Sequence, residues 1–263
     1  MKETTREPAC PGRFYPAAAD TLRRDVTGYL ADAEGSEDRP PRAIIAPHAG
    51  YPFSGAIAGH AFATLTPRAD AIERALLIGP SHFVEFDGLA AAPQTHFATP
   101  LESTTVARDV VETLVDDGLA EIDSVPHARE HSLETHLPFL QHLADGVEII
   151  PIVTGRDAGD GATRLIASAL ADEGTIVSVS SDLSHYLDYA TARQVDDKTR
   201  RAIESLRPDD LDDQQACGHT AIRGLLRAAR DRDMTVETLA MANSGDTSGD
   251  KSRVVGYGAW AFY

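Results

Sequence analysis

Short apolar runs alternate along the chain with longer amphipathic stretches. The apolar runs are rich in Val and Ile, which is typical of strands covered on both faces, and they occupy residues 43–47, 75–79, 147–155 and 175–182. The amphipathic stretches predict helices, and they lie near residues 56–65, 103–116, 131–144, 160–172, 189–206 and 216–230. The stretch "KSRVVGYGAWAFY" at residues 251–263 alternates apolar and polar positions and favours a further strand.

This order of elements predicts helices packed on both faces of a largely parallel sheet. No repeat, low-complexity block or long linker divides the 263 residues. The stretch "EGSEDRPPR" at residues 34–42 is expected to be a loop that leads into the first core strand. The length is ordinary for one α/β domain. We therefore expect a single-domain α/β/α sandwich over residues 1–263.

The chain is strongly acidic, with 24 Lys and Arg against 41 Asp and Glu and a formal net charge of -17. Nucleic-acid binding needs clustered Lys and Arg that contact phosphates, so we do not expect it here. Lysine occurs only at Lys2, Lys198 and Lys251. This imbalance is typical of halophilic proteins, whose surface charges are screened by salt; an ordinary acidic protein is the alternative.

The sequence also lacks the usual marks of membrane and secreted proteins. No stretch approaches the roughly 18 to 20 apolar residues that a membrane helix needs. The stretch "MKETTREPACPGRFY" has no apolar segment behind its early charges, so we expect no secretory signal. Cys10 and Cys217 are too few to form the disulfide framework of small secreted proteins. The resulting expectation is a cytoplasmic protein without a membrane partner.

Three of the expected strands are followed by histidine. "AIIAPHAGY" places His48 after one strand, and "ALLIGPSHF" places His82 after another. "IVSVSSDLSHY" places Asp182 and His185 after a third strand, where they would face the same way if a helical turn begins there. In open α/β sheets the ligand crevice lies beyond the carboxyl ends of the strands. One such histidine is usually a polar turn residue, but three at equivalent positions predict a shared site.

The histidines at the strand ends are candidate metal ligands. Neutral imidazoles commonly bind iron, copper and zinc, and two histidines with one anionic ligand leave coordination positions open for substrate or oxygen. A thiolate can supply the anion, which draws attention to Cys217 in "QQACGHTAI". Cys217 precedes the expected start of a helix, where amide dipoles lower the pKa of a thiol and favour its ligating form. The alternative for Cys217 is a small buried hydrophobic residue.

A second histidine cluster lies in "HAREHSLETHLPFLQH" at residues 127–142. Its order is H-x-x-E-x-H, and histidines five residues apart on a helix point about 140° away from each other, so the zinc-protease interpretation fails. His131 and Glu134 can share a helix face, and they form a candidate pair that orients a ligand or substrate. The alternative is a polar helix start followed by core leucines.

Several stretches together resemble one known family. They are "GRFYP", "RAIIAPHAGYPFSG", "LLIGPSHF", "EHSLETHLPFL", "VSSDLSHY", "ACGHTAI" and "SGDKSRVVGYGA". In order and spacing they resemble the Memo family, called AmmeMemoRadiSam system protein B in prokaryotes, from about residue 8 to the end of the chain. The fold of that family is similar to class III extradiol ring-cleavage dioxygenases, which bind non-haem iron with two histidines and a carboxylate and use another histidine as acid/base.

The resemblance implies roles for individual residues. His48 and His82 would be metal ligands, and Cys217 stands where the dioxygenases place their carboxylate. His185 would be a further ligand or the proton-transfer group. Asp182 would orient His185 or the substrate.

The same resemblance implies residues that line the crevice. His131 and Glu134 would lie there with catalytic roles. Phe14 and Tyr15 match an aromatic pair near the pocket mouth of the eukaryotic relatives, where the pair is linked to peptide binding. Tyr51, in the "APHAGY" motif, is expected beside them as a third substrate-binding residue.

The sequence departs from the family pattern at two places. Phe83 follows the histidine of "GPSH" where some relatives carry a second histidine, which makes the rim more apolar. "HTAI" after the cysteine and glycine replaces a basic sequence of the animal relatives. A thiolate in place of a carboxylate would also soften the site and favour copper or a redox role over ring cleavage.

The resemblance therefore implies a non-haem site for iron or copper, with zinc less expected, and a dioxygenase-like oxidoreductase. The alternatives are a metal-dependent hydrolase or lyase, and a module that binds a peptide or partner protein without turnover. The expected ligand is an unknown small molecule or peptide. Prokaryotic relatives are associated by name with a radical-SAM protein and an AMMECR1-like protein, which are the implied partners.

Overall fold

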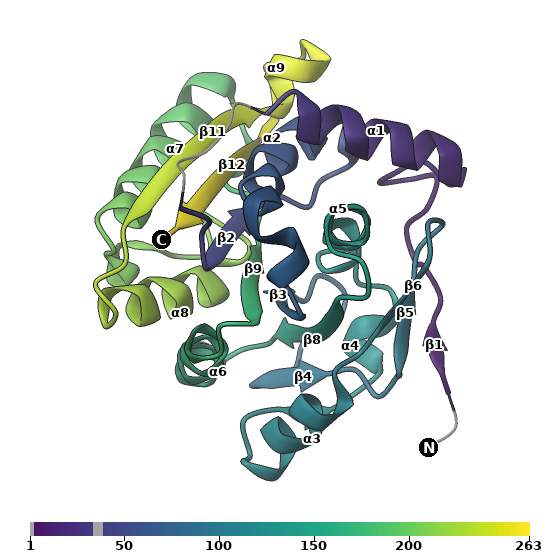
Figure 1. Cartoon of the computed structure of the whole chain (residues 1–263). Helices are drawn as coiled ribbons and strands as arrows, with labels where there is room; N and C mark the ends of the chain where they lie inside the picture. Colours follow the sequence, from purple (N-terminus) through teal and green to yellow (C-terminus); the bar gives the residue numbers. More distant parts are fainter. Residues whose placement is uncertain (1–2, 34–38) are drawn as a thin grey trace.

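A nine-stranded sheet forms the centre of the computed structural model, which describes residues 3–33 and 39–263 (Figure 1). Its four central strands are parallel neighbours in the order β2, β9, β3 and β8. They span Ala43–Ala46 (β2), Thr175–Ser180 (β9), Arg74–Pro80 (β3) and Glu148–Thr154 (β8). All four strands expected from the apolar runs are therefore confirmed. Residues 34–38 of the expected first loop lie outside the described residues.

Antiparallel strands extend the sheet on both sides of this parallel core. β12 pairs with β2, β10 and β11, and β4 joins β8 at the other side and pairs in turn with β7. A separate three-stranded sheet has the order β1, β5, β6. The bounds are Val254–Phe262 (β12), His185–Leu187 (β10), Val236–Asn243 (β11), Leu89–Ala91 (β4), Glu121–Ile122 (β7), Thr5–Arg6 (β1), His96–Ala98 (β5) and Ser103–Thr105 (β6).

Helices cover both faces of the central sheet, which confirms the α/β/α arrangement. Helices α1, α2 and α5 pack together on one face, and α6, α7 and α8 lie on the other (Figure 1). The longer helices are Ala19–Ala31 (α1), Tyr51–Ala63 (α2), Arg108–Asp116 (α3), Leu137–Leu143 (α5), Gly159–Ala171 (α6), Tyr189–Glu204 (α7) and His219–Arg230 (α8). Short helices are Val125–Ala128 (α4) and Ser244–Ser248 (α9), and 3-10 turns cover Thr66–Ala71, Glu134–His136 and Pro208–Asp210.

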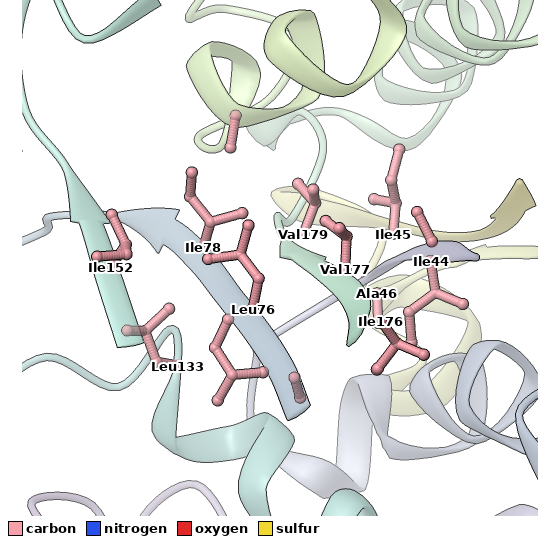
Figure 2. Packing of buried hydrophobic residues seen from close by; sticks show 14 of the residues in the cluster. Ile44, Ile45, Ala46, Leu76, Ile78, Leu133, Ile152, Ile176, Val177 and Val179 are labelled. Carbon is pink, nitrogen blue, oxygen red and sulfur yellow. The ribbon is translucent and has the colours of Figure 1, made fainter. Parts of the chain in front are cut away.

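The central strands are buried on both faces, as their Val- and Ile-rich composition predicts. Figure 2 shows Ile45, Val177 and Val179 pointing to one side of the sheet and Ile44 and Ile176 to the other. All five side chains are fully buried. Burial of each such side chain contributes roughly 1.5–3 kcal/mol, so the two layers of contacts hold the parallel strands in a rigid frame.

Two expected helices begin later than their patterns suggest. Residues 103–105 form β6 against β5, and the helix of that stretch starts at Arg108. In the stretch 131–144, a 3-10 turn starts at Glu134 and α5 follows it with Pro138 in its first turn, where proline loses no helical hydrogen bond. His131 therefore lies in a loop. No helix among the described residues has both the length and the apolar character that crossing a membrane requires.

A close contact between α1 and α2 gives a test of the packing. A Cβ on Gly59 would overlap the backbone carbonyl of Tyr29, whereas a Cβ on Gly28 in α1 would meet nothing within 4 Å. Gly59→Ala should therefore lower the free energy of unfolding by about 1–3 kcal/mol. The matched change Gly28→Ala should raise it by about 0.5–1 kcal/mol, because alanine is the better helix former. Urea unfolding measures both; equal effects would contradict the contact.

Candidate metal centre

Three of the sequence-predicted site residues meet at the carboxyl ends of the parallel strands. His48 follows β2, His82 follows β3, and Asp182 follows β9. Because β2 pairs with β9 and β9 with β3, the three strand ends are neighbours. All three side chains line one cavity of about 500 Å³, which places the candidate site where open α/β sheets bind ligands.

Three imidazoles form the densest part of this cavity. One ring nitrogen from each of His48, His82 and His131 lies within 4.8 Å of the others. The ring centroids are 5.1 Å apart for His48 and His82, and 4.5 Å apart for His82 and His131. Their spacing is suitable for three ligands of one metal ion. The sequence predicted His131 as a crevice residue, and the structure places it among the candidate ligands.

Hydrogen bonds fix the ring orientation of His48. The Ser180 hydroxyl donates to the carbonyl oxygen of Ser132 at 2.6 Å, and it lies 2.7 Å from Nδ1 of His48. Since the hydroxyl proton is used by the carbonyl, the hydroxyl oxygen accepts from Nδ1–H. The Nε2 atom of His48 then carries the free lone pair. Burial lowers the pKa of His48 well below its usual value, so the ring is neutral.

Glu130 fixes His82 in the same way. Its carboxylate accepts from Nδ1 of His82 at 2.8 Å and from the backbone N–H of His82 at 2.7 Å. Burial alone would raise the pKa of Glu130, but the hydrogen bonds from His82 lower it to about 2. The carboxylate is therefore ionised, and Nε2 of His82 is left free to bind a metal. Carboxylates that orient histidine ligands in this way are usual around metal sites.

Sequence reasoning missed Glu130, although it stands directly before His131 in "EHSLE". Its carboxylate also accepts from the backbone N–H groups of His131 and Ser132, at 3.0 and 2.9 Å. One buried carboxylate thus links two histidines that lie 49 positions apart in the chain (131 − 82). The available signal in the sequence was a glutamate directly before His131. Its partner His82 lies in a distant part of the chain, after β3, so the pairing could not be read from the sequence.

His131 reaches the site from a loop. Its ring packs on Phe14 with a centroid distance of 4.3 Å and stacks on His82. Nδ1 lies 3.3 Å from Oε1 of Glu130 without the geometry of a hydrogen bond. Burial lowers the pKa of His131 to about 4 despite the charge of Glu130, so this imidazole is also neutral near pH 7.

Cys217 lies beside these histidines, but its side chain is a protonated thiol and not the expected thiolate. Sγ lies 3.4 Å from Nε2 of His48, and with the His48 orientation above it is the thiol that donates. The residue immediately precedes Gly218, the N-cap of α8. Burial raises the pKa of the Cys217 thiol far above its usual value, and the charge of Asp182 raises it further. The expectation of a pKa lowered by the helix is wrong, because burial outweighs the amide dipoles.

Asp182 and His185 line the cavity but do not pair as expected. No helical turn forms after β9; His185 begins the strand β10. The Asp182 carboxylate accepts from the backbone N–H of His48 at 2.9 Å. Burial raises the pKa of Asp182 to about 6, partly offset by the backbone N–H groups of His48 and Ala49, while burial lowers the pKa of His185. Asp182 can therefore gain or lose a proton near neutral pH, and the neutral ring of His185 faces the same cavity.

Glu134 lies behind the site and does not line the cavity. It is fully buried, and its carboxylate accepts from the Arg6 guanidinium at 2.6 Å and from the Tyr15 hydroxyl at 2.5 Å. The backbone N–H groups of Ala9 and Cys10 also donate to it. The expected helix face shared with His131 is wrong, because His131 precedes the helical turn. Glu134 instead fixes the N-terminal segment to the loop that carries His131.

Of the three predicted substrate-binding aromatic residues, Phe14 lines the cavity. Tyr15 is buried and donates to Glu134, and Tyr51 is buried and donates to the carbonyl oxygen of Thr135 at 2.8 Å. Tyr15, expected near the pocket mouth, therefore lies in the core, and Tyr51 does not line the cavity either. Their rings pack in the core beneath the site, with centroids 5.8 Å apart.

The buried ion pair of Arg6 and Glu134 gives a prediction about stability. Glu134→Gln replaces one carboxylate oxygen by an amide NH₂ group, which would face the N–H and O–H donors that now bind the carboxylate. The free energy of unfolding should therefore fall by about 3–5 kcal/mol. Glu112→Gln is the control, because it removes an exposed pair with Arg108 worth about 0.5 kcal/mol or less. Urea unfolding of the two variants would contradict this account if it gave equal losses.

Comparison with known proteins agrees with this architecture. A MEMO1 family protein of Methanosarcina barkeri is 34% identical, over 97% of this chain and 98% of the relative. A MEMO1 family protein of Thermotoga maritima is 32% identical, over 96% of this chain and 97% of the relative. The crystal structure of an uncharacterized protein from Escherichia coli K12 matches with a TM-score of 0.57 at 11% identity, over 85% of this chain and all of that chain, which shows a common fold. The family model described as Memo-like protein matches residues 6–261, and the chain therefore belongs to the Memo family.

Proposed function

We propose that the chain binds one iron or copper ion through His48, His82 and His131, with Cys217 as a fourth ligand. We further propose that it acts as an oxidoreductase on a small molecule in the adjoining cavity. The observation that carries the proposal is the convergence of three imidazoles, of which two are oriented from behind by Glu130 and Ser180. Histidines that bind a metal almost always donate their other ring N–H to a partner of this kind.

The donor set suits a first-row transition metal. Imidazole nitrogen binds iron, copper and zinc, and thiolate sulfur adds affinity for softer ions such as copper. The Cys217 thiol is protonated in the metal-free chain, so its proton must leave when a metal takes its place. The choice of iron or copper over zinc follows the resemblance to the extradiol dioxygenases and the softness of the thiolate. Such an ion would supply electron transfer to a bound substrate or oxidant.

The chain's own residues would position substrate and move protons. Asp182 is held by the His48 backbone, and its pKa of about 6 lets it gain or lose a proton near pH 7. His185 is neutral and faces the same cavity, so its ring can accept a proton from a substrate. Phe14 closes one side and keeps water from the face of His131.

Metal content tests the first part of the proposal. The chain purified without added metal should contain close to one equivalent of iron or copper by mass spectrometry. His48→Ala and His82→Ala should abolish binding, and Glu130→Gln should weaken it about 10–100-fold because His82 loses its carboxylate partner. His142→Ala, an exposed histidine on α5, is the control and should keep full content. Unchanged metal in the His48 and His82 variants would refute the site.

Redox behaviour tests the second part. The iron- or copper-loaded chain, reduced without oxygen, should change its absorption spectrum when oxygen is admitted, and Asp182→Asn should slow turnover more than it weakens metal binding. Zinc occupancy with no redox change would instead indicate a hydrolase. Normal binding of a peptide or partner protein after loss of the ligands would indicate a binding module.

A further inference from the structure

Two arginine–aromatic pairs border the metal cavity. The guanidinium of Arg129 lies over the ring of Phe83 at 4.9 Å, and that of Arg253 lies over the ring of Tyr186 at 5.1 Å. Phe83 contacts His131 edge-on, and Tyr186 lines the cavity beside His185. Both rings are largely exposed, at 47% for Phe83 and 63% for Tyr186. Each pair therefore presents a flat apolar surface and a positive charge to a ligand that enters the cavity.

Tyr186 is held in this position by an unusual backbone. It has a φ of 59°, in the left-handed region that tyrosine rarely adopts. It is the extra residue of a bulge, because His185 pairs with Val255 and Leu187 with Val254. Bulges beside active sites redirect a side chain, and here the strained residue places its ring over the cavity. A glycine would adopt this backbone without strain.

The two pairs flank the candidate ligands. In the sheet order, β10 with Tyr186 lies on one side of β2 and β9, and β3 with the following Phe83 lies on the other. The carboxyl ends of β2 and β9 carry His48 and Asp182. The two arginine-capped rings therefore lie on opposite sides of the candidate ligands in the order of the sheet.

These arginines stand out in a chain of net charge -17. Neither Arg129 nor Arg253 forms an ion pair with a carboxylate among residues 3–33 and 39–263, and both are exposed. The neighbouring cavity of about 680 Å³ differs, because its Arg156 is already paired with Asp87 at 3.1 Å and with Glu85 at 4.0 Å. Two positive charges without a carboxylate partner among the described residues thus lie on aromatic rings beside the metal cavity.

We infer that the metal cavity takes a small organic carboxylate with a flat apolar body. Its carboxylate would meet Arg129 and Arg253, and its body would lie against Phe83, Tyr186 and Phe14. The inference rests on the proposed function for the use of this ligand as substrate. A small ligand is favoured because 500 Å³ fits a molecule of modest size, and because the overall negative charge repels large acidic partners.

The test titrates the full chain calorimetrically with benzoate, with its neutral isostere benzamide and with acetate. Each titration uses metal-loaded protein and protein treated with EDTA, with metal content measured on the same samples. Benzoate should bind about fivefold more tightly than benzamide in both metal states, as expected for two exposed charge contacts. Acetate should bind more weakly than benzoate, because it lacks the flat body.

Variants separate the arginine pairs from other effects. The double variant Arg129→Gln with Arg253→Gln should lose the preference for benzoate over benzamide. Arg193→Gln is the matched control, because Arg193 lies over Tyr189 at 5.8 Å outside this cavity and its loss should leave the preference intact. Tyr186→Gly, which suits the left-handed backbone, should weaken benzoate and benzamide alike while the chain stays folded.

Three outcomes would overturn the inference. They are equal affinities for benzoate and benzamide, a preference that survives in the double arginine variant, and a preference that disappears with EDTA, which would assign the anion to the metal. A chain that binds no metal but prefers benzoate through its arginines would support the anion site and refute the proposed metal function.

Discussion

The parallel pairing of β2, β9 and β3 is the constraint on which the site depends. The register joins Ala46 to Ser180 and Ile78 to Val179, so the strands end at nearly the same level. Since both faces of these strands are packed against other elements, a slip in register would break the packing of both layers and is strongly opposed. Residues that follow the strands therefore inherit fixed backbone positions, and hydrogen bonds to Ser180 and Glu130 then orient the rings of His48 and His82.

His131 does not directly follow a strand, and buried polar contacts fix the position of its loop instead. Arg6 donates to the carbonyl oxygens of His127 and Glu130, and to the carboxylate of Glu134. These bonds fix both ends of the loop that carries His131. Removing one member would leave an unpaired buried charge, whereas an apolar replacement of the whole set could be equally stable. We therefore assign the network to the positioning of the loop.

The sequence predicts this site unevenly, for physical reasons. The central strands and the residues that follow them, His48 and His82, could be predicted because strand composition and order determine them. The place of His131 among the candidate ligands could not, since a loop brings it there through partners on other elements. The protonated state of Cys217 was mispredicted because helix position is local, whereas burial depends on the whole fold. Tyr15 was misplaced for the same reason: its partner Glu134 lies 119 residues away.

The cavity and its rim differ in charge. His48, His131 and His185 are neutral, because burial lowers their pKa values. Positive charge is found instead on Arg129 and Arg253, at the rim. Screening limits the reach of the surface carboxylates to about 8 Å at physiological salt, and less at higher salt, which weakens their repulsion of an anion at the rim. A metal ion among the imidazoles would add positive charge behind the rim, beside the carboxylates of Glu130 and Asp182.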